Sequence, residues 1–182
     1  MTEQTSRPTA MLDGVRVVSV EQAVAMPFCS FMLAELGAEV IKVERPGTGD
    51  VVRGWDDVVR GLSTGFVSMN AGKSDIVLDL RSEQGKKAIH RLCEESDVFL
   101  ENFAPGALER LGLGPDDLLK ANPRLVYCSL SGYGQNGPYR EAKAYDVLIQ
   151  GEAGILLSNG FPDAPPRWGC RSPISSVARL QP

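Results

Sequence analysis

Two short β-branched segments, separated by one helix-length segment, constrain this sequence most. Residues 15–20 (VRVVSV) and 39–43 (EVIKV) are each typical of a buried strand, because valine and isoleucine dominate and no turn residue interrupts them. Between them, residues 27–36 predict a helix, since Pro27 suits the first helical position and Gly37 suits a left-handed C-cap. A strand, a helix and a strand so close together form a βαβ unit, whose two strands run parallel.

The same alternation continues along the chain. Further strands are predicted over residues 75–80, 97–100 and 124–130. Further helices are predicted from the N-cap Ser82, from Pro115, and over residues 145–157. Residues 45–72 are rich in glycine and charge and predict mostly loop. The order of elements predicts an α/β fold, a Rossmann-like open parallel sheet with helices on both faces.

Length and composition fit one ordinary domain. The chain has 182 residues, of which 43% are hydrophobic and 23% charged, as in globular proteins. We expect a flexible N-terminal tail over residues 1–11 and the Rossmann-like domain over residues 12–162. Residues 163–182 show neither helical nor strand periodicity and predict an atypical, weakly structured tail, although a doubly wound sheet normally continues with another strand and helix.

Charge and cysteine content exclude several classes of partner. The net charge of −4 gives no bulk attraction to nucleic acid or to a membrane surface. No signal peptide or membrane-spanning segment is visible, so we expect a cytoplasmic protein. The four cysteines are scattered without metal-site spacing, which predicts no metal, and Cys93 and Cys128 lie in apolar runs typical of buried core thiols.

The turn after the first strand argues against a dinucleotide ligand. NAD-type turns need the pattern G-x-G-x-x-G so that backbone can approach the pyrophosphate, whereas residues 21–27 (EQAVAMP) contain no glycine. Another phosphate-bearing ligand stays open, because Arg45, Lys73 and Lys143 lie where strands end or loops begin. Lys42 lies inside a strand, and we expect it on a solvated face.

Acid–base residues are few. The single histidine, His90, falls in an amphipathic helix and predicts a surface or packing role, and no G-x-S-x-G nucleophile elbow is present. Any catalysis would therefore use carboxylates. Asp146, at the start of the predicted helix over residues 145–157, is the best-placed candidate among them.

Several short blocks of sequence follow one another along most of the chain. They are, in order, LDGVRV (12–17), MPFCS (26–30), LAELGAEVIKVE (33–44), GD (49–50) with Arg53, NAGKS (70–74), LDL (78–80), DVFLENF (97–103), PG (105–106), LG (111–112), YCSLSGYG (127–134), GP (137–138) and AYD (144–146). In content and order these blocks resemble family III CoA-transferases, the group of formyl-CoA transferase and carnitine CoA-transferase, which makes the resemblance specific.

The resemblance implies a two-domain enzyme that forms an interlocked homodimer, with coenzyme A bound by the Rossmann-like domain. An aspartate attacks the acyl-CoA thioester to give a mixed anhydride, the CoA thiolate returns to give an enzyme-linked thioester, and a carboxylic acid then collects the CoA. Coenzyme A or acyl-CoA is thus the expected ligand, with no metal. Carried over to matching positions, the expected CoA contacts are Gln22, Ala23, Val24, Ala25, Arg45, Leu78, Asn102, Arg110, Lys143 and Tyr145.

Two departures from the family pattern bear on activity. The acyl-CoA racemase branch has a histidine before the position of Asp146, where this chain has Tyr145, so a racemase is an alternative with weaker support. The nucleophilic aspartate is expected near Ser175, and no acidic residue follows Asp163. We therefore expect no catalytic residue in this chain.

One hypothesis accounts for the tail. Codons can be chosen so that a shifted frame near Trp168 encodes the missing acidic segment, and we expect a truncated or frameshifted member of the family. A non-catalytic CoA-binding protein and a non-functional truncated product stay open as alternatives.

Overall fold

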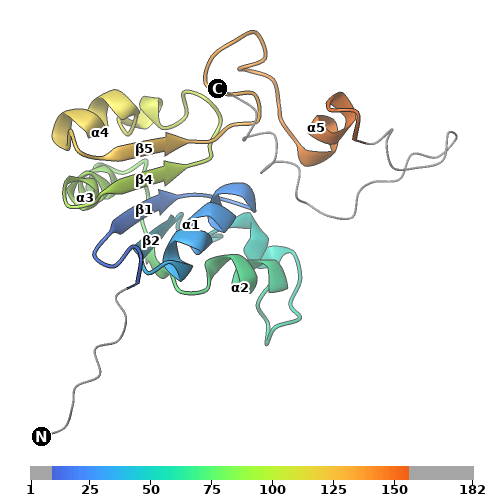
Figure 1. Cartoon of the computed structure of the whole chain (residues 1–182), viewed down its shortest axis with the longest axis horizontal. Helices are drawn as coiled ribbons and strands as arrows, with labels where there is room; N and C mark the ends of the chain where they lie inside the picture. The colour runs from blue at the N-terminus through green and yellow to red at the C-terminus, as the bar shows by residue number, and fades with distance from the viewer. Residues whose placement is uncertain (1–9, 156–182) are drawn as a thin grey trace, which may run out of the picture.

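The computed structural model describes residues 10–155, and its strands form one five-stranded sheet, all of whose neighbouring strands are parallel (Figure 1). The strands are β1 (Arg16–Val20), β2 (Glu39–Glu44), β3 (Ser74–Val77), β4 (Val98–Glu101) and β5 (Val126–Ser129). The spatial order β3-β2-β1-β4-β5 places β1 at the centre. The predicted fold class is confirmed.

Helices and 3-10 turns connect the strands. They are α1 (Ala25–Glu35), η1 (Val51–Gly54), α2 (Thr64–Asn70), α3 (Glu83–Glu94), η2 (Glu109–Leu111), α4 (Pro115–Ala121) and α5 (Asp146–Glu152). Two predicted helix starts are confirmed, because the Ser82 side chain accepts a hydrogen bond from the amide of Gly85 and Pro115 opens α4. The predicted start at Pro27 was wrong, because α1 begins two residues earlier, at Ala25.

Two apolar clusters occupy the two faces of the sheet. Val18, Val43 and Phe99 pack with Ile89 of α3 and Leu118 of α4 on one face. On the other face, Val17, Val40 and Leu100 pack with Met26 of α1. Successive residues of β1 and β4 thus point to opposite sides, as strand geometry requires, and both sides of the sheet are covered.

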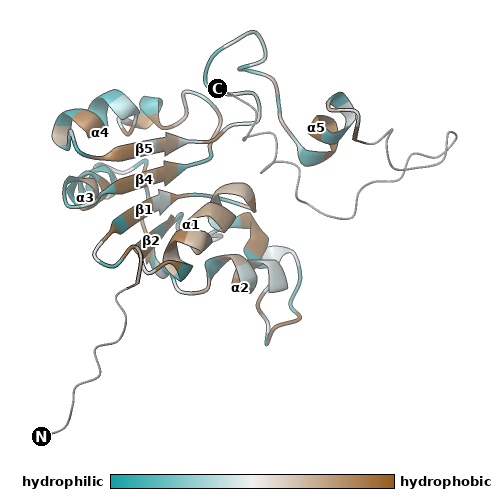
Figure 2. Cartoon of the chain, viewed as in Figure 1, coloured by the Kyte–Doolittle hydropathy of each residue, from teal (hydrophilic) through white to brown (hydrophobic). Residues whose placement is uncertain are grey.

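Helix α1 differs from α3 in the distribution of its apolar residues. The predicted helix α3 buries Ile89 and Cys93 and keeps charged residues outside, whereas α1 is hydrophobic around most of its circumference (Figure 2). Phe28 and Met32 of α1 are 44% and 45% exposed. Among the described residues, no helix is long and apolar enough to cross a membrane.

Further details of the expected fold were wrong. The segment predicted as mostly loop contains α2, a short helix that Ser63 caps by accepting from the amide of Phe66. The third strand ends at Val77, before the predicted residue 80.

The two cysteines predicted to be buried core thiols differ in exposure. Cys93 is buried, as expected, and burial raises the pKa of its thiol to about 12, whereas Cys128 is exposed. The proposed tails 1–11 and 163–182 fall almost wholly outside the described residues.

The packing of α3 against β1 leads to a stability prediction. We expect Ile89→Ala to lower the free energy of unfolding by about 2–5 kcal/mol, because Ile89 is fully buried and the substitution leaves a cavity. The exposed neighbour Lys87 serves as the control, since Lys87→Ala changes stability by less than about 0.5 kcal/mol. Urea unfolding of the three proteins measures both values, and equal stability of Ile89→Ala and the parent would contradict the described core.

Candidate functional site

A cavity of about 670 Å³ lies at the carboxyl ends of the central strands. Four segments form most of its wall: residues 23–25 after β1, 102–105 after β4, 130–133 after β5, and 140–146 leading into α5. The cavity lies at the switch point of the sheet, where the order of the strands reverses. From β1 the chain continues to β2 on one side, and β4 pairs with β1 on the other side. Ligands of open α/β sheets bind in this crevice.

The structure gathers part of the predicted ligand-contact set at this cavity. The predicted contacts that line it are Ala23, Val24, Ala25, Asn102, Lys143 and Tyr145. Gln22 lies directly behind the wall, where its backbone N–H donates to Asn102 Oδ1 at 2.9 Å and its carbonyl accepts from Asn102 Nδ2 at 2.8 Å. Residues that are far apart in the sequence therefore meet at one site.

The other three predicted contacts do not line the cavity. Arg45 is exposed and donates from Nε to the carbonyl of Gly49 at 3.1 Å. Leu78 packs against the apolar cluster beneath α3 and α4. Arg110 lies outside the cavity but near Arg140, which lines it. A Cβ placed on Gly106 would lie between the two side chains, 2.9 Å from Arg110 Nη1 and 3.5 Å from Arg140 Nη2.

The cavity wall combines cations with apolar and aromatic surface. Arg140 and Lys143 carry positive charge, while Trp55, Phe103 and Tyr133 contribute rings. Two acids, Glu141 and Asp146, also line the cavity, and Glu141 Oε1 lies 3.4 Å from Arg140 Nε. The wall thus suits a ligand with an apolar or aromatic part whose anionic groups are placed near Lys143 and Arg140. Sequence reasoning missed Arg140 and Trp55, because nothing in their local sequence marks them as neighbours of the turn after β1.

Two buried oxygens at the cavity have no hydrogen-bond partner within the described part of the chain. They are Ser131 Oγ and Asp146 Oδ1, both from residues that line the cavity. The other carboxylate oxygen of Asp146 accepts from Gln150 Nε2 at 2.8 Å. Buried polar atoms are nearly always paired in proteins, so these oxygens are available to hydrogen-bond donors of a ligand or of water.

The turn that contributes residues 23–25 has a strained backbone. Ala23 has a φ of +65°, in the left-handed region that costs a residue with a Cβ about 1–2 kcal/mol. Its N–H donates to Asp50 Oδ1 at 3.0 Å. The glycine-free turn thus adopts at Ala23 a conformation that glycine would adopt without strain.

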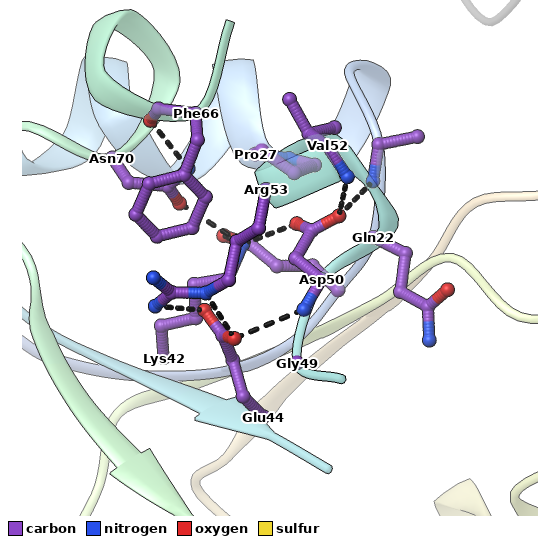
Figure 3. Close-up of polar contacts among 12 residues, drawn as sticks. Gln22, Pro27, Lys42, Glu44, Gly49, Asp50, Val52, Arg53, Phe66 and Asn70 are labelled. Atoms are coloured by element: carbon purple, nitrogen blue, oxygen red, sulfur yellow. Dashed lines mark hydrogen bonds and ion pairs between the residues drawn. The ribbon is translucent and has the colours of Figure 1, made fainter. Parts of the chain in front are cut away.

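A fully buried ion cluster lies beside this turn. Lys42 Nζ lies 2.7 Å from Asp50 Oδ2 and 3.6 Å from Glu21 Oε1, and Lys73 Nζ lies 2.8 Å from Glu21 Oε1. All four side chains are at most 2% exposed. The expected solvated position of Lys42 was therefore wrong: its side chain is on the same face as Val40, beneath α1 and α2 (Figure 3).

Lys73 is likewise absent from the candidate ligand site. Its Nζ also donates to the carbonyl of Pro27 at 2.9 Å and to Asn70 Oδ1 at 3.1 Å. Burial lowers the pKa of the Lys73 ammonium, and the neighbouring Glu21 carboxylate opposes that shift. The lysine thus neutralises an internal carboxylate instead of meeting an anion from solvent.

A second ion pair joins the same region to the surface. Arg53 donates to both oxygens of Glu44, from Nε at 2.7 Å and from Nη2 at 2.9 Å, and its guanidinium stacks 3.7 Å from the centre of the Phe66 ring. Burial would raise the pKa of Glu44, but the hydrogen bonds from Arg53 and from the Asp50 amide outweigh it, so the pKa is lowered.

His90 contributes to packing, as the sequence predicts. Its Nε2 lies 2.9 Å from the carbonyl oxygen of Gly112, which joins α3 to the loop before α4. Among residues 10–155, no group of three or more His, Cys, Asp or Glu side chains is arranged to hold a metal ion.

Comparison with known proteins decides the family. The model of CoA-transferase family III matches residues 12–175. This chain belongs to CoA-transferase family III. Similar relatives include the acetyl-CoA:oxalate CoA-transferase of Acetobacter aceti, 41% identical over 167 residues that are 91% of this chain and 43% of the relative, and the formyl-CoA:oxalate CoA-transferase of Rhodopseudomonas palustris, 41% identical over 87% of this chain and 37% of the relative.

Solved structures agree with the assignment to this family. The orthorhombic form of Rv3272 from Mycobacterium tuberculosis has a TM-score of 0.87 and 39% identity, covering 96% of this chain and 49% of that one. A CAIB/BAIF family protein from Brucella suis has a TM-score of 0.84 and 38% identity, covering 94% and 50%. The chain spans about 40% of the length of the curated relatives it matches.

The Glu44–Arg53 pair leads to a pH-dependent prediction. Since folding lowers the pKa of Glu44, its stabilising contribution is fully present above its ordinary pKa of 4.5 and is lost as the pH falls through the lowered value. We expect Glu44→Gln to cost about 1–3 kcal/mol at pH 7 and progressively less below pH 4.5. Urea unfolding from pH 7 to pH 3 measures this, with the exposed Glu35→Gln as a control. A cost that does not change with pH would contradict the prediction.

Proposed function

We propose that the protein binds CoA in the manner of its family, whose reaction moves CoA between an acyl-CoA and a carboxylic acid, and that residues 10–155 supply the CoA-binding site. The observation that carries the proposal is the cavity at the switch point, where Ala23, Asn102, Lys143 and Tyr145 converge. Family membership supports the chemistry, since the names of relatives describe transfer from acetyl-CoA or formyl-CoA to oxalate.

The cavity suits the parts of CoA. Its cations, Arg140 and Lys143, would face phosphates, and Arg110 and Arg45 would extend this positive surface beyond the cavity. The aromatic and apolar wall would pack against the adenine or the pantetheine arm. The unpartnered Ser131 and Asp146 oxygens would accept hydrogen bonds from its amide or hydroxyl groups.

We further propose that this chain alone binds CoA without forming the covalent intermediate. The family nucleophile is expected near Ser175, which lies outside the described residues, and residues 164–182 contain no carboxylate side chain. A non-catalytic CoA-binding role follows from the same observation. A racemase is the less favoured candidate, because Tyr145 stands where that branch has its histidine.

The first test is CoA binding. We expect isothermal titration to show binding that weakens as salt rises, because charge-assisted contacts to phosphates are screened. Lys143→Ala and Arg45→Ala should each cost about 1.5–3 kcal/mol of binding free energy if they contact phosphate. Lys120→Ala, which removes an exposed cation of α4, is the matched control. Unchanged affinity in Arg45→Ala would remove Arg45 from the site, and no binding by the parent would refute the CoA site.

The second test is transfer chemistry. We expect the 182-residue chain to show no CoA transfer from an acyl-CoA to a carboxylic acid and no hydroxylamine-sensitive acyl-enzyme adduct, because the covalent route needs a carboxylate beside the thioester. Mass spectrometry after incubation with acyl-CoA detects the adduct. Turnover by the 182-residue chain would contradict this, and a hydroxylamine-sensitive adduct located on Asp146 and absent from Asp146→Asn would identify Asp146 as the nucleophile. Exchange of an α-proton for deuterium would instead favour the racemase.

A further inference from the structure

We propose that Asp50 is a positioning residue for ligand binding, which acts by holding Ala23 in its left-handed conformation at the wall of the cavity. Asp50 lies outside the cavity, in the loop between β2 and η1, and is 1% exposed. The proposal rests on the proposed CoA site for its functional consequence, whereas its structural part is independent of the ligand.

The carboxylate of Asp50 is held in a fixed position. Oδ2 accepts from Lys42 Nζ at 2.7 Å, and the Asp50 N–H donates to Glu44 Oε2 at 2.9 Å (Figure 3). Lys42 is itself held by Asn70 Oδ1 at 2.9 Å. Asp50 is thus fixed at its backbone and at one oxygen, which leaves Oδ1 directed at the turn after β1.

Oδ1 of Asp50 holds two backbone amides. It accepts from the amide of Ala23 at 3.0 Å and from the amide of Val52 at 3.1 Å. The preceding residue, Gln22, is held by both backbone groups to Asn102. Asp50 and Asn102, which lie on opposite sides of β1, therefore fix two consecutive residues of a turn that contains no glycine. Because of these contacts, Ala23 keeps its φ of +65°.

The turn held by Asp50 forms part of the wall of the proposed ligand site. Ala23 and the next two residues line the cavity, and α1 begins at Ala25. If Ala23 relaxed to a negative φ, its peptide groups would turn and the wall formed by residues 23–25 would change shape. Release of Asp50 should therefore weaken ligand binding although Asp50 does not line the cavity.

An alternative role for Asp50 is to cap η1 alone, since Oδ1 also accepts from Val52. The two roles predict different effects of Ala23→Gly. Glycine adopts positive φ without strain, so it lessens the need for the Asp50 contact. Under the positioning role Ala23→Gly rescues an Asp50 variant, whereas under the capping role it does not.

The experiment measures CoA affinity by isothermal titration for the parent, Asp50→Ala, Asp50→Asn and the double variant Ala23→Gly with Asp50→Ala. We expect Asp50→Ala to weaken CoA binding at least about tenfold. Asp50→Asn keeps an acceptor for the Ala23 amide and should weaken it less. The double variant should recover most of the loss. Asp57→Ala, which removes an exposed acid of the segment between η1 and α2, is the control and should bind as the parent does.

A ligand-independent measurement separates this inference from the CoA proposal. Amide hydrogen exchange should show protection of Ala23 in the parent and its loss in Asp50→Ala, while Val18 in the centre of the sheet stays protected and reports that the variant is folded. If the parent does not bind CoA, the proposed function fails and the exchange result alone decides whether Asp50 holds the turn. Retained Ala23 protection in Asp50→Ala, or no rescue by Ala23→Gly where CoA binds, would overturn the inference.

Discussion

The contact between Lys42 and Asp50 is the interaction on which the carboxyl edge of this sheet depends. It joins a lysine inside β2 to the last residue of the loop that leads into η1, at 2.7 Å and out of contact with water. With Glu21 after β1 and Lys73 before β3, it forms a set of two carboxylates and two ammonium groups whose formal charges cancel. Desolvating four charged groups is costly, and close pairing with further hydrogen bonds is what offsets that cost.

This cluster divides the carboxyl edge into two regions with different properties. Toward β2 the carboxyl ends of β1 and β2 are closed by the ion pairs of Lys42 with Glu21 and Asp50, beneath α1 and α2. Toward β4 and β5 they open into the cavity, where the buried Glu101 ends β4 and accepts from the Phe103 amide at 2.8 Å. The turn at Ala23 lies on the boundary, so the closed region sets the shape of one wall of the open region.

The sequence predicted the sheet and part of the site, and each failure has a physical cause. Strand and helix order followed from β-branched runs and caps. The resemblance to the family named Ala23, Asn102 and Lys143, which line the cavity, and their contact with CoA stays a prediction. Lys42 was misplaced because a lysine in a strand is ordinarily solvated, and its acidic partner Asp50 is a tertiary contact that local sequence does not show. Helix α2 was missed because its glycine and β-branched valine weaken helical propensity, so that packing decides its conformation.

The central position of β1 has a consequence for the order in which this chain can fold. Neighbouring strands are all parallel, so no pair can form by a tight hairpin. β1 pairs with β2 over a short separation in sequence, for example Arg16 with Glu39, but with β4 over a long one, for example Val17 with Val98. Loop closure over so long a segment is slow, because entropy is lost before contacts compensate for it. The junction between β1 and β4 is also where the cavity lies. The β1–β2 half can therefore assemble first, and the binding site is complete only after the slowest pairing of the sheet.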